Sequence, residues 1–258
     1  MPHGPRRASG RGGPGRAPRG GARRPLELGE RFETYLERNV YATQRLLEAA
    51  SSGGTENFVH ASSSSVYGPD GGGPVGEDAP RRPASPYGLS KLAAEELVGL
   101  YAGEKGVRAT VLRYFTVYGP RQRPEMALSR FIERVTSGEP VEVFGDGTQV
   151  REMTYVSDVV EATVAALEVE GTVSARAYNV GGGSRATVAE LVALVGEALG
   201  EEPEVAYGPP VPGDVRSTWA DLTRARRELG YAPRVSVEEG VREQVRWTVA
   251  GRAAPRVA

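Results

Sequence analysis

The chain has 258 residues, of which 39% are hydrophobic and 25% are charged, and its formal net charge is −1. This length allows one large α/β domain with a small appended lobe, but not two independent enzymes. The absence of cysteine excludes disulfides, thiolate metal sites and cysteine nucleophiles, and with only His3 and His60 a histidine metal centre or a Ser/His/Asp triad is disfavoured.

Residues 1–25 form a separate compositional block that is rich in Gly, Arg and Pro and has no acidic residue. Such a segment has little to bury, so we expect a disordered tail. Arg/Gly-rich tails can contact RNA, but nothing else in the composition favours nucleic acid, and we do not expect it as a partner. No run of about 18 apolar residues and no secretion signal is present, so no membrane is expected and the cytoplasm is the default location.

Beyond the tail, the first elements alternate between helix and strand. Apolar side chains at near-helical spacing predict an amphipathic helix over 32–47, and a short strand is expected at 58–61. A second helix begins near Ser85 and ends at Gly106, and a buried strand occupies 109–119. This order predicts a parallel sheet with crossover connections. The apolar face expected for the second helix consists of Ala93, Leu97 and Leu100.

The pattern loosens after Gly119 but still contains recognisable elements. Asp158 is placed in the first turn of a helix, where its charge suits the helix dipole. The remaining predicted elements are a helix at 127–137, a strand and turn at 141–147, a strand end and helix at 154–168, a strand, glycine turn and helix at 178–199, a short strand after 204, and helices around 222–229 and 237–249.

A tyrosine and a lysine lie one turn apart near the start of the second helix. The i, i+4 spacing of Tyr87 and Lys91 places the phenol and the ammonium on one helix face. A tyrosine that acts as a base near pH 7 needs its pKa lowered by about 3 units, or about 4 kcal/mol. Nearby positive charges can contribute to this shift. Alone, the pair is also compatible with an ordinary surface contact.

Four serines follow the predicted strand at 58–61, namely Ser62–Ser65. Hydroxyl groups at the carboxyl end of such a strand face the crevice in which doubly wound sheets bind ligands. The same serines are also compatible with a simple turn.

Four segments in chain order resemble the motifs of a known enzyme family: ASSSSVYG, SPYGLSK, LRYFTVYGPRQRP and VFGDGTQVREMTYVSDVVEA. They are similar to those of the extended short-chain dehydrogenase/reductases, within the NAD-dependent epimerase/dehydratase family. The resemblance extends from about Phe32 to Trp247 and is strongest to UDP-glucose and UDP-glucuronate 4-epimerases. It implies an α/β fold with a doubly wound, Rossmann-like parallel sheet that lacks its first strands, a small C-terminal substrate-binding lobe, and NAD as cofactor.

The resemblance also implies a division of the chain and a role for individual residues. Residues 26–180 are expected to form an incomplete NAD-binding domain, with 119–150 contributing to the substrate lobe, and 181–258 to form mainly that lobe. The expected catalytic residues are Ser63, Tyr87 and Lys91. The expected cofactor contacts are Asn39, Ser62, Tyr87, Lys91 and Phe115. The expected substrate contacts are Ser63, Thr116, Arg151 and Asp214, and no metal is expected.

The implied reaction is epimerisation through a transient 4-keto sugar. Tyr87 takes the proton of the 4-hydroxyl while the C4 hydride moves to NAD, the ketose rotates, and the hydride returns to the other face. Related 4,6-dehydratases have Thr-Asp-Glu where this chain has serines at 63–65, which disfavours elimination. Thr116 in FTVYGP resembles the UDP-glucuronate enzymes, although a threonine also suits a strand end, so glucose and galactose stay open.

Two features depart from the family. Its glycine-rich strand-turn-helix is not visible, because Gly10, Gly12 and Gly15 have no strand before them and Gly181–Gly183 match a structural turn. Val211 also stands where relatives usually have a phosphate-binding arginine. We therefore expect an N-terminally truncated family member.

Two functional hypotheses remain from the sequence. The chain is either a nucleotide-sugar 4-epimerase, or an inactive truncated member that binds a nucleotide sugar or pairs with an intact paralogue. The expected partners are a nucleotide-diphosphate sugar and a second copy of the chain. In relatives the helices that correspond to 30–50 and 86–104 form the bundle of a homodimer.

Overall fold

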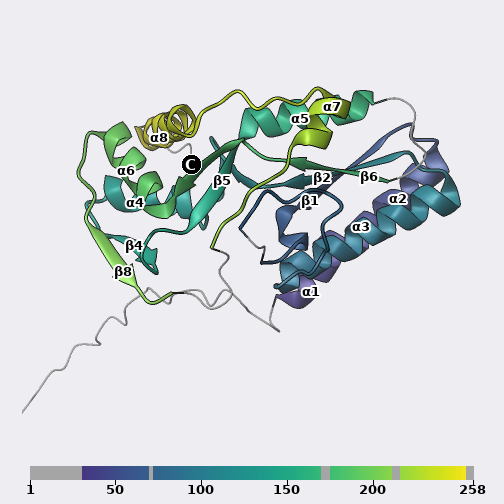
Figure 1. Ribbon diagram of the computed structural model, residues 1–258, viewed down its shortest axis with the longest axis horizontal. Coiled ribbons are helices and arrows are strands. Elements are labelled where there is room, and N and C mark those ends of the chain that lie inside the picture. Colours follow the sequence, from purple (N-terminus) through teal and green to yellow (C-terminus); the bar gives the residue numbers. More distant parts are fainter. Residues whose placement is uncertain (1–30, 70–71, 170–174, 211–215, 254–258) are drawn as a thin grey trace, which may run out of the picture.

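The structure is a computed structural model that describes residues 31–69, 72–169, 175–210 and 216–253 (Figure 1). A parallel sheet in the order β1-β2-β6 lies between two layers of helices. Its strands are β1 (Phe58–Ser63), β2 (Ala109–Tyr114) and β6 (Arg176–Val180). The helices are α2 (Ala42–Gly53) and α3 (Pro86–Lys105) on one face, and α5 (Val156–Glu168) and α7 (Thr223–Leu229) on the other. The predicted doubly wound α/β fold is confirmed.

A second group of elements packs around its own apolar core beside this sheet. It contains a mixed sheet in the order β3-β5-β7 and a parallel pair of β4 and β8. Its strands are β3 (Thr116–Tyr118), β4 (Val141–Phe144), β5 (Val150–Tyr155), β7 (Ser184–Thr187) and β8 (Val205–Gly208). Its helices are α4 (Ala127–Thr136), α6 (Val188–Leu199) and α8 (Val237–Ala253). The domain boundary expected at residue 180 stays a prediction.

The apolar segment 109–119 connects the two sheets. Expected as one strand, it is split at Phe115, whose N–H donates to the carbonyl of Val180 at 2.9 Å, so that β2 belongs to the parallel sheet and β3 to the mixed one. The backbone changes sheets at this residue. The carboxyl end of β2 therefore lies where the two groups of elements meet.

The first predicted helix is confirmed, although it is not uniform. α1 (Phe32–Tyr35) continues through a π-helical turn at Leu36–Tyr41 into α2. A π turn adds one residue to the helical repeat, and such turns are frequent at functional sites. Among the residues expected on its apolar face, Leu47 is buried but Leu46 is exposed.

Local signals define α3 as predicted. Ser85 accepts a hydrogen bond from the N–H of Gly88 at 3.1 Å, and Gly106 ends the helix with a φ of +67°. The expected apolar face was wrong at Leu100, which is 61% exposed, whereas Leu97 is partly buried and packs against the core. The buried apolar side chains are instead small ones, which let the helix approach the sheet and α2 closely: Ala94, Val98 and Ala102.

A buried ion pair joins α3 to the sheet. Arg113 of β2 donates from Nε and Nη2 to Glu95 of α3 at 3.1 and 2.8 Å, and the residues are only 3% and 5% exposed. Its Nη1 donates to the hydroxyl of Tyr67 at 2.8 Å, and Ser62 donates to Glu95. A buried pair is stable only when its remaining donors and acceptors are satisfied in this way.

Removing one member of this pair is expected to destabilise the fold strongly. Arg113→Met removes the buried cation and leaves the Glu95 carboxylate only the partly exposed Arg81 at 3.5 Å, so the free energy of unfolding in urea should fall by about 3–5 kcal/mol. Arg130→Met is the matched control, because Arg130 pairs with Glu142 at 3.2 Å on the surface. It should cost no more than about 1 kcal/mol. Equal losses in the two variants would contradict the importance given to the buried pair.

None of the helices in the described part of the chain is both long and apolar enough to cross a membrane.

Candidate active site

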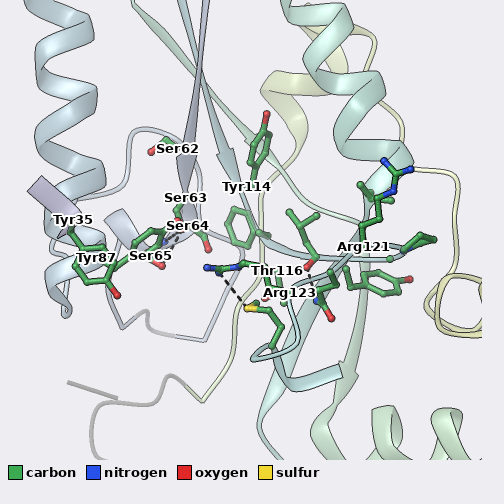
Figure 2. Close-up of a pocket in the computed structure, with 18 residues that line it drawn as sticks. Tyr35, Ser62, Ser63, Ser64, Ser65, Tyr87, Tyr114, Thr116, Arg121 and Arg123 are labelled. Atoms are coloured by element: carbon green, nitrogen blue, oxygen red, sulfur yellow. Dashed lines mark hydrogen bonds between the residues drawn. The ribbon is translucent and has the colours of Figure 1, made fainter. Parts of the chain in front are cut away.

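A pocket of about 680 Å³ opens at the carboxyl ends of β1 and β2, where the two groups of elements meet (Figure 2). It brings together five of the residues predicted for the site: Ser62, Ser63, Tyr87, Phe115 and Thr116. The rest of its lining consists of Tyr35, Ser64, Ser65, Tyr114, Val117–Arg123, Met126 and Val156.

The serine run turns sharply where β1 ends. Ser63 accepts a hydrogen bond from the N–H of Ser65 at 3.2 Å and donates to the hydroxyl of Ser65 at 3.1 Å, which caps a short 3₁₀ turn. The first turn of α3 lies against it, since a Cβ on Gly88 would stand 2.4 Å from the carbonyl oxygen of Ser65. This close approach, possible only for glycine, sets Tyr87 beside Ser63.

Tyr87 is half-buried, and its ring packs edge-on against that of Tyr35 at 5.7 Å between centroids. Burial raises the pKa of the Tyr87 phenol, while a hydrogen bond with Ser63 and the charge of Arg123 act to lower it. Arg123 is therefore a positive charge that favours the phenolate and that the sequence analysis did not consider. Figure 2 shows Arg123 pointing across the pocket toward the serine run and Tyr87.

Lys91 is anchored to the outer side of the sheet. Its Nζ donates to the carbonyl of Ala61 at 3.0 Å and lies 5.9 Å from the centroid of the Tyr87 ring. The N–H of Phe58 donates to the carbonyl of Arg108, so the backbone groups of Phe58 point toward β2. Because the direction of the backbone groups alternates along a strand, the carbonyl of Ala61 points away from β2. It lies at the free edge of β1, where no further strand pairs within the described residues. Burial lowers the pKa of Lys91.

Two expected cofactor contacts are engaged within the protein. The hydroxyl of Ser62 lies at the pocket but donates to Glu95, and Ser62 is almost completely buried. The side-chain amide of Asn39 donates to the hydroxyl of Ser90 at 2.9 Å, which ties the π turn to α3, and Asn39 does not line the pocket described above. Their contacts with a cofactor stay predictions.

The expected substrate contacts are distributed differently. Thr116 lies in the pocket wall next to Phe115. Arg151 is on β5, where its Nη1 donates to the carbonyl of Val150 at 3.0 Å, and it does not line this pocket. Asp214 and Val211 lie outside the described residues.

His60 is buried in β1, and its Nε2 has no hydrogen-bond partner among the described residues. Burial, followed by the charge of Lys91, lowers the pKa of His60 to about 4. The imidazole is therefore neutral at pH 7, as expected for a packed strand residue.

The glycine turn after β6, Gly181–Gly183, packs directly against residues of β5. A Cβ on Gly182 would stand 1.8 Å from the carbonyl oxygen of Met153, and one on Gly181 would stand 2.2 Å from Oε1 of Glu152. The backbone therefore packs against β5 and leaves no space there for a phosphate. The interpretation of Gly181–Gly183 as a structural turn is confirmed.

The pocket residues that the sequence analysis did not assign to the site include Tyr35, Arg121 and Arg123. The two arginines follow the turn at Gly119 in the motif GPRQRP, so their proximity to the end of β3 was visible. Their direction was not visible, because it depends on the fold of the loop.

The electrostatics around Tyr87 give a test that needs no ligand. Ser63→Ala and Arg123→Gln should each raise the pKa of the Tyr87 phenol further, because each removes a group that acts to lower it. The pKa would be measured by ¹³C NMR on tyrosine-labelled protein, with Tyr87→Phe to assign the signal. Ser64→Ala is the control and should leave this pKa unchanged. An unaltered pKa in Ser63→Ala would show that the two side chains do not interact.

Comparison with known proteins adds three findings. Residues 26–181 match the NAD dependent epimerase/dehydratase family. Over 217 residues the chain is 39% identical to the uncharacterized UDP-glucose epimerase YtcB of Bacillus subtilis, covering 84% of this chain and 68% of that protein. Over 214 residues it is 39% identical to dTDP-glucose 4,6-dehydratase of Streptomyces griseus, covering 83% and 65%.

Among solved structures, UDP-glucuronic acid 4-epimerase from Bacillus cereus, in complex with UDP-glucuronic acid and NAD, matches with a TM-score of 0.84. Sequence identity is 38%, and the match covers 88% of this chain and 72% of that chain. The chain thus spans 68% and 65% of the length of the two curated relatives. Because an epimerase and a dehydratase are both 39% identical to it, overall identity does not separate these reactions.

Proposed function

Because the chain belongs to the NAD-dependent epimerase/dehydratase family, we propose that its pocket catalyses C4 epimerisation of a nucleotide sugar, with UDP-glucuronate as the preferred substrate. The observation that carries this proposal is that Tyr87 and Ser63, at the end of β1, line one pocket opposite the guanidinium of Arg123. A phenol, a hydroxyl and a cation are thereby directed at one site.

The residues present fit the nicotinamide and ribose end of NAD. Phe115 supplies an apolar wall at the carboxyl end of β2. The ammonium of Lys91 donates one of its three N–H groups to the carbonyl of Ala61, which leaves two N–H groups for ribose hydroxyls. Tyr87 stands beside both. When bound, NAD would supply the acceptor and the later donor of the C4 hydride.

The protein itself handles the proton. The Tyr87 phenolate takes the proton of the sugar 4-hydroxyl as the ketone forms, and the phenol returns it when the ketone is reduced. The Ser63 hydroxyl lines the same pocket and acts to lower the pKa of the phenol, so it would stabilise the phenolate during the transfer. Burial of Tyr87 opposes the phenolate, so the charge of Arg123 is needed to offset part of that cost.

The charge of the pocket wall favours an anionic sugar. The wall contains Arg121 and Arg123 together with the hydroxyls of Ser64, Ser65 and Thr116, and none of its described residues is Asp or Glu. An arginine and hydroxyl donors suit a carboxylate at C5 of the sugar. The absence of an acid from the described wall also supports epimerisation over the elimination that 4,6-dehydratases perform.

The proposal predicts that Tyr87→Phe abolishes epimerisation. Purified chain with NAD should interconvert UDP-glucuronate and its C4 epimer, whereas Tyr87→Phe should lose activity by at least about 100-fold, within the range of general acid–base contributions. UDP-glucuronate affinity should change little in calorimetry, because the ring remains. Activity that survives in Tyr87→Phe, or is absent from the unsubstituted chain, would contradict the proposal.

The helices that carry Tyr35 and Tyr87 also expose apolar side chains. The π turn, α2 and α3 lie on the same side of the molecule (Figure 1), and the exposed large apolar residues in them are Leu36, Tyr41, Leu46, Leu89 and Leu100. Exposed apolar side chains on neighbouring helices are typical of protein–protein interfaces. We propose that these helices pair with those of a second copy to form a homodimer.

The dimer is testable by light scattering coupled to gel filtration. A double variant with Leu46→Glu and Leu100→Glu should convert the dimer into monomer, because it buries charges in the interface. Val164→Glu is the matched control, because Val164 is exposed on α5 at the opposite face of the sheet. A monomeric parent chain, or equal dissociation in the control, would overturn the proposed interface.

A further inference from the structure

The wall opposite Tyr87 is a loop in a conformation that needs support. Gly119 has a φ of +130°, and Arg121 has a φ of +68°, in the left-handed region that is costly for a side chain with a Cβ. The loop carries Arg123, whose side chain is 74% exposed and contacts only the sulfur of Met126 at 3.6 Å and Glu125 at 3.6 Å within the described residues. These two contacts are with neighbouring residues of the same loop, so they do not explain why the Arg123 guanidinium is directed toward Tyr87.

The loop backbone is held by a buried glutamine from the C-terminal helix. Gln244 of α8 is 1% exposed, and its Oε1 accepts a hydrogen bond from the N–H of Gly119 at 2.8 Å. Its Nε2 donates to Oε1 of Gln122 at 2.9 Å and to the hydroxyl of Ser129 at 3.2 Å. Both ends of the amide are used, so its orientation is determined.

Gln122 closes the network from inside the loop. Its Oε1 also accepts from the hydroxyl of Ser129 at 2.9 Å, and its Nε2 donates to the carbonyl of Val117 at 3.0 Å. The network thereby connects the end of β3, the middle of the loop, α4 and α8. Arg121 and Arg123 flank Gln122, so the position of Gln122 constrains both.

The helix that carries Gln244 packs closely against the side chain of Tyr118 on β3. One turn earlier, a Cβ on Gly240 would stand 2.1 Å from the hydroxyl oxygen of Tyr118, so only glycine permits this approach. On the same helix Val241 and Val245 are buried in the apolar core. Because α8 is held by this packing, the position of the Gln244 side chain next to the loop is fixed as well.

We propose that Gln244 is a positioning residue that sets the specificity of the pocket for an anionic sugar, by holding the loop 119–123 so that Arg123 faces the substrate. This inference rests on the proposed function, since it concerns the sugar that the same pocket selects. Gln244 contacts no ligand, and it acts through the hydrogen bonds to Gly119 and Gln122. A glutamine with a purely structural role would affect all sugars equally.

The test compares Gln244→Met with a control on the same helix. Methionine keeps the length of the side chain but removes the hydrogen bonds to the loop. Thr248→Val is the control, because Thr248 donates only to the carbonyl of Gln244 at 2.8 Å among the described contacts and does not touch the loop. Gln122→Met removes the same network from the loop side, and the double variant should lose no more than the larger single effect.

Two measurements are made on the full chain. In ligand-free protein, amide hydrogen exchange at Gly119 and Gln122 should accelerate in Gln244→Met and stay unchanged in Thr248→Val. In calorimetry with NAD present, Gln244→Met should weaken the affinity for UDP-glucuronate by about tenfold or more, because it displaces a charged hydrogen-bond donor of the carboxylate. The affinity for UDP-glucose should fall by less than about twofold.

The outcomes separate this inference from the proposed function. Unchanged hydrogen exchange in Gln244→Met would overturn the inference whatever the ligand does. If the parent chain prefers UDP-glucuronate and Gln244→Met weakens both sugars equally, only the inference fails. If the parent chain shows no preference for UDP-glucuronate, the specificity role falls together with the proposed substrate, while C4 epimerisation of a neutral sugar would stand.

Discussion

The arrangement of the pocket depends on the buried ion pair between Glu95 of α3 and Arg113 of β2. The hydrogen bonds from Arg113 to Glu95 fix the position of α3 along β2. The hydroxyl of Ser62 donates to the same carboxylate. Tyr87 and Lys91 lie on that helix about two turns and one turn before Glu95, and Ser63 follows Ser62 in the chain. One satisfied carboxylate thus fixes both the helix and the strand end whose side chains meet in the pocket, a geometry that proton transfer requires.

The opposite wall is fixed by neutral hydrogen bonds. The backbone leaves the parallel sheet at Phe115, passes through β3 and turns at Gly119, where the amide of Gln244 accepts its N–H. Ser63 and Tyr87 therefore face a wall built by the second group of elements. Because the described wall has arginines and no carboxylates, this architecture suits a substrate that carries negative charge beyond its diphosphate.

Features encoded by neighbouring residues were predictable from the sequence. Ser85, Pro86 and Gly106 are local start and stop signals, so the ends of α3 were found. The proximity of Ser63 and Tyr87 was implied by the resemblance of their motifs to those of the family. Gln244 and Gly119 are far apart in the chain, and no periodicity relates a buried amide on a C-terminal helix to a turn after a central strand.

The exposed Leu100 and the π turn were missed for related physical reasons. Helical periodicity identifies an apolar stripe but does not say whether a sheet or another molecule covers it, and small residues at the closest approach take the buried positions instead. A π turn requires a tertiary contact to stabilise its extra residue, and here Asn39 supplies one to Ser90. The direction of the Arg123 side chain likewise depends on a loop conformation that its own sequence does not specify.

The central claim is that the pocket around Ser63 and Tyr87 inverts C4 of UDP-glucuronate by removing and returning the same hydride. It is tested most directly by incubating the chain with UDP-glucuronate and NAD in D₂O and following the sugar protons by NMR. We predict that the C4 epimer, UDP-galacturonate, accumulates with protium retained at C4, because the hydride never exchanges with solvent. Failure to form the epimer, or its formation with deuterium at C4, would contradict the claim.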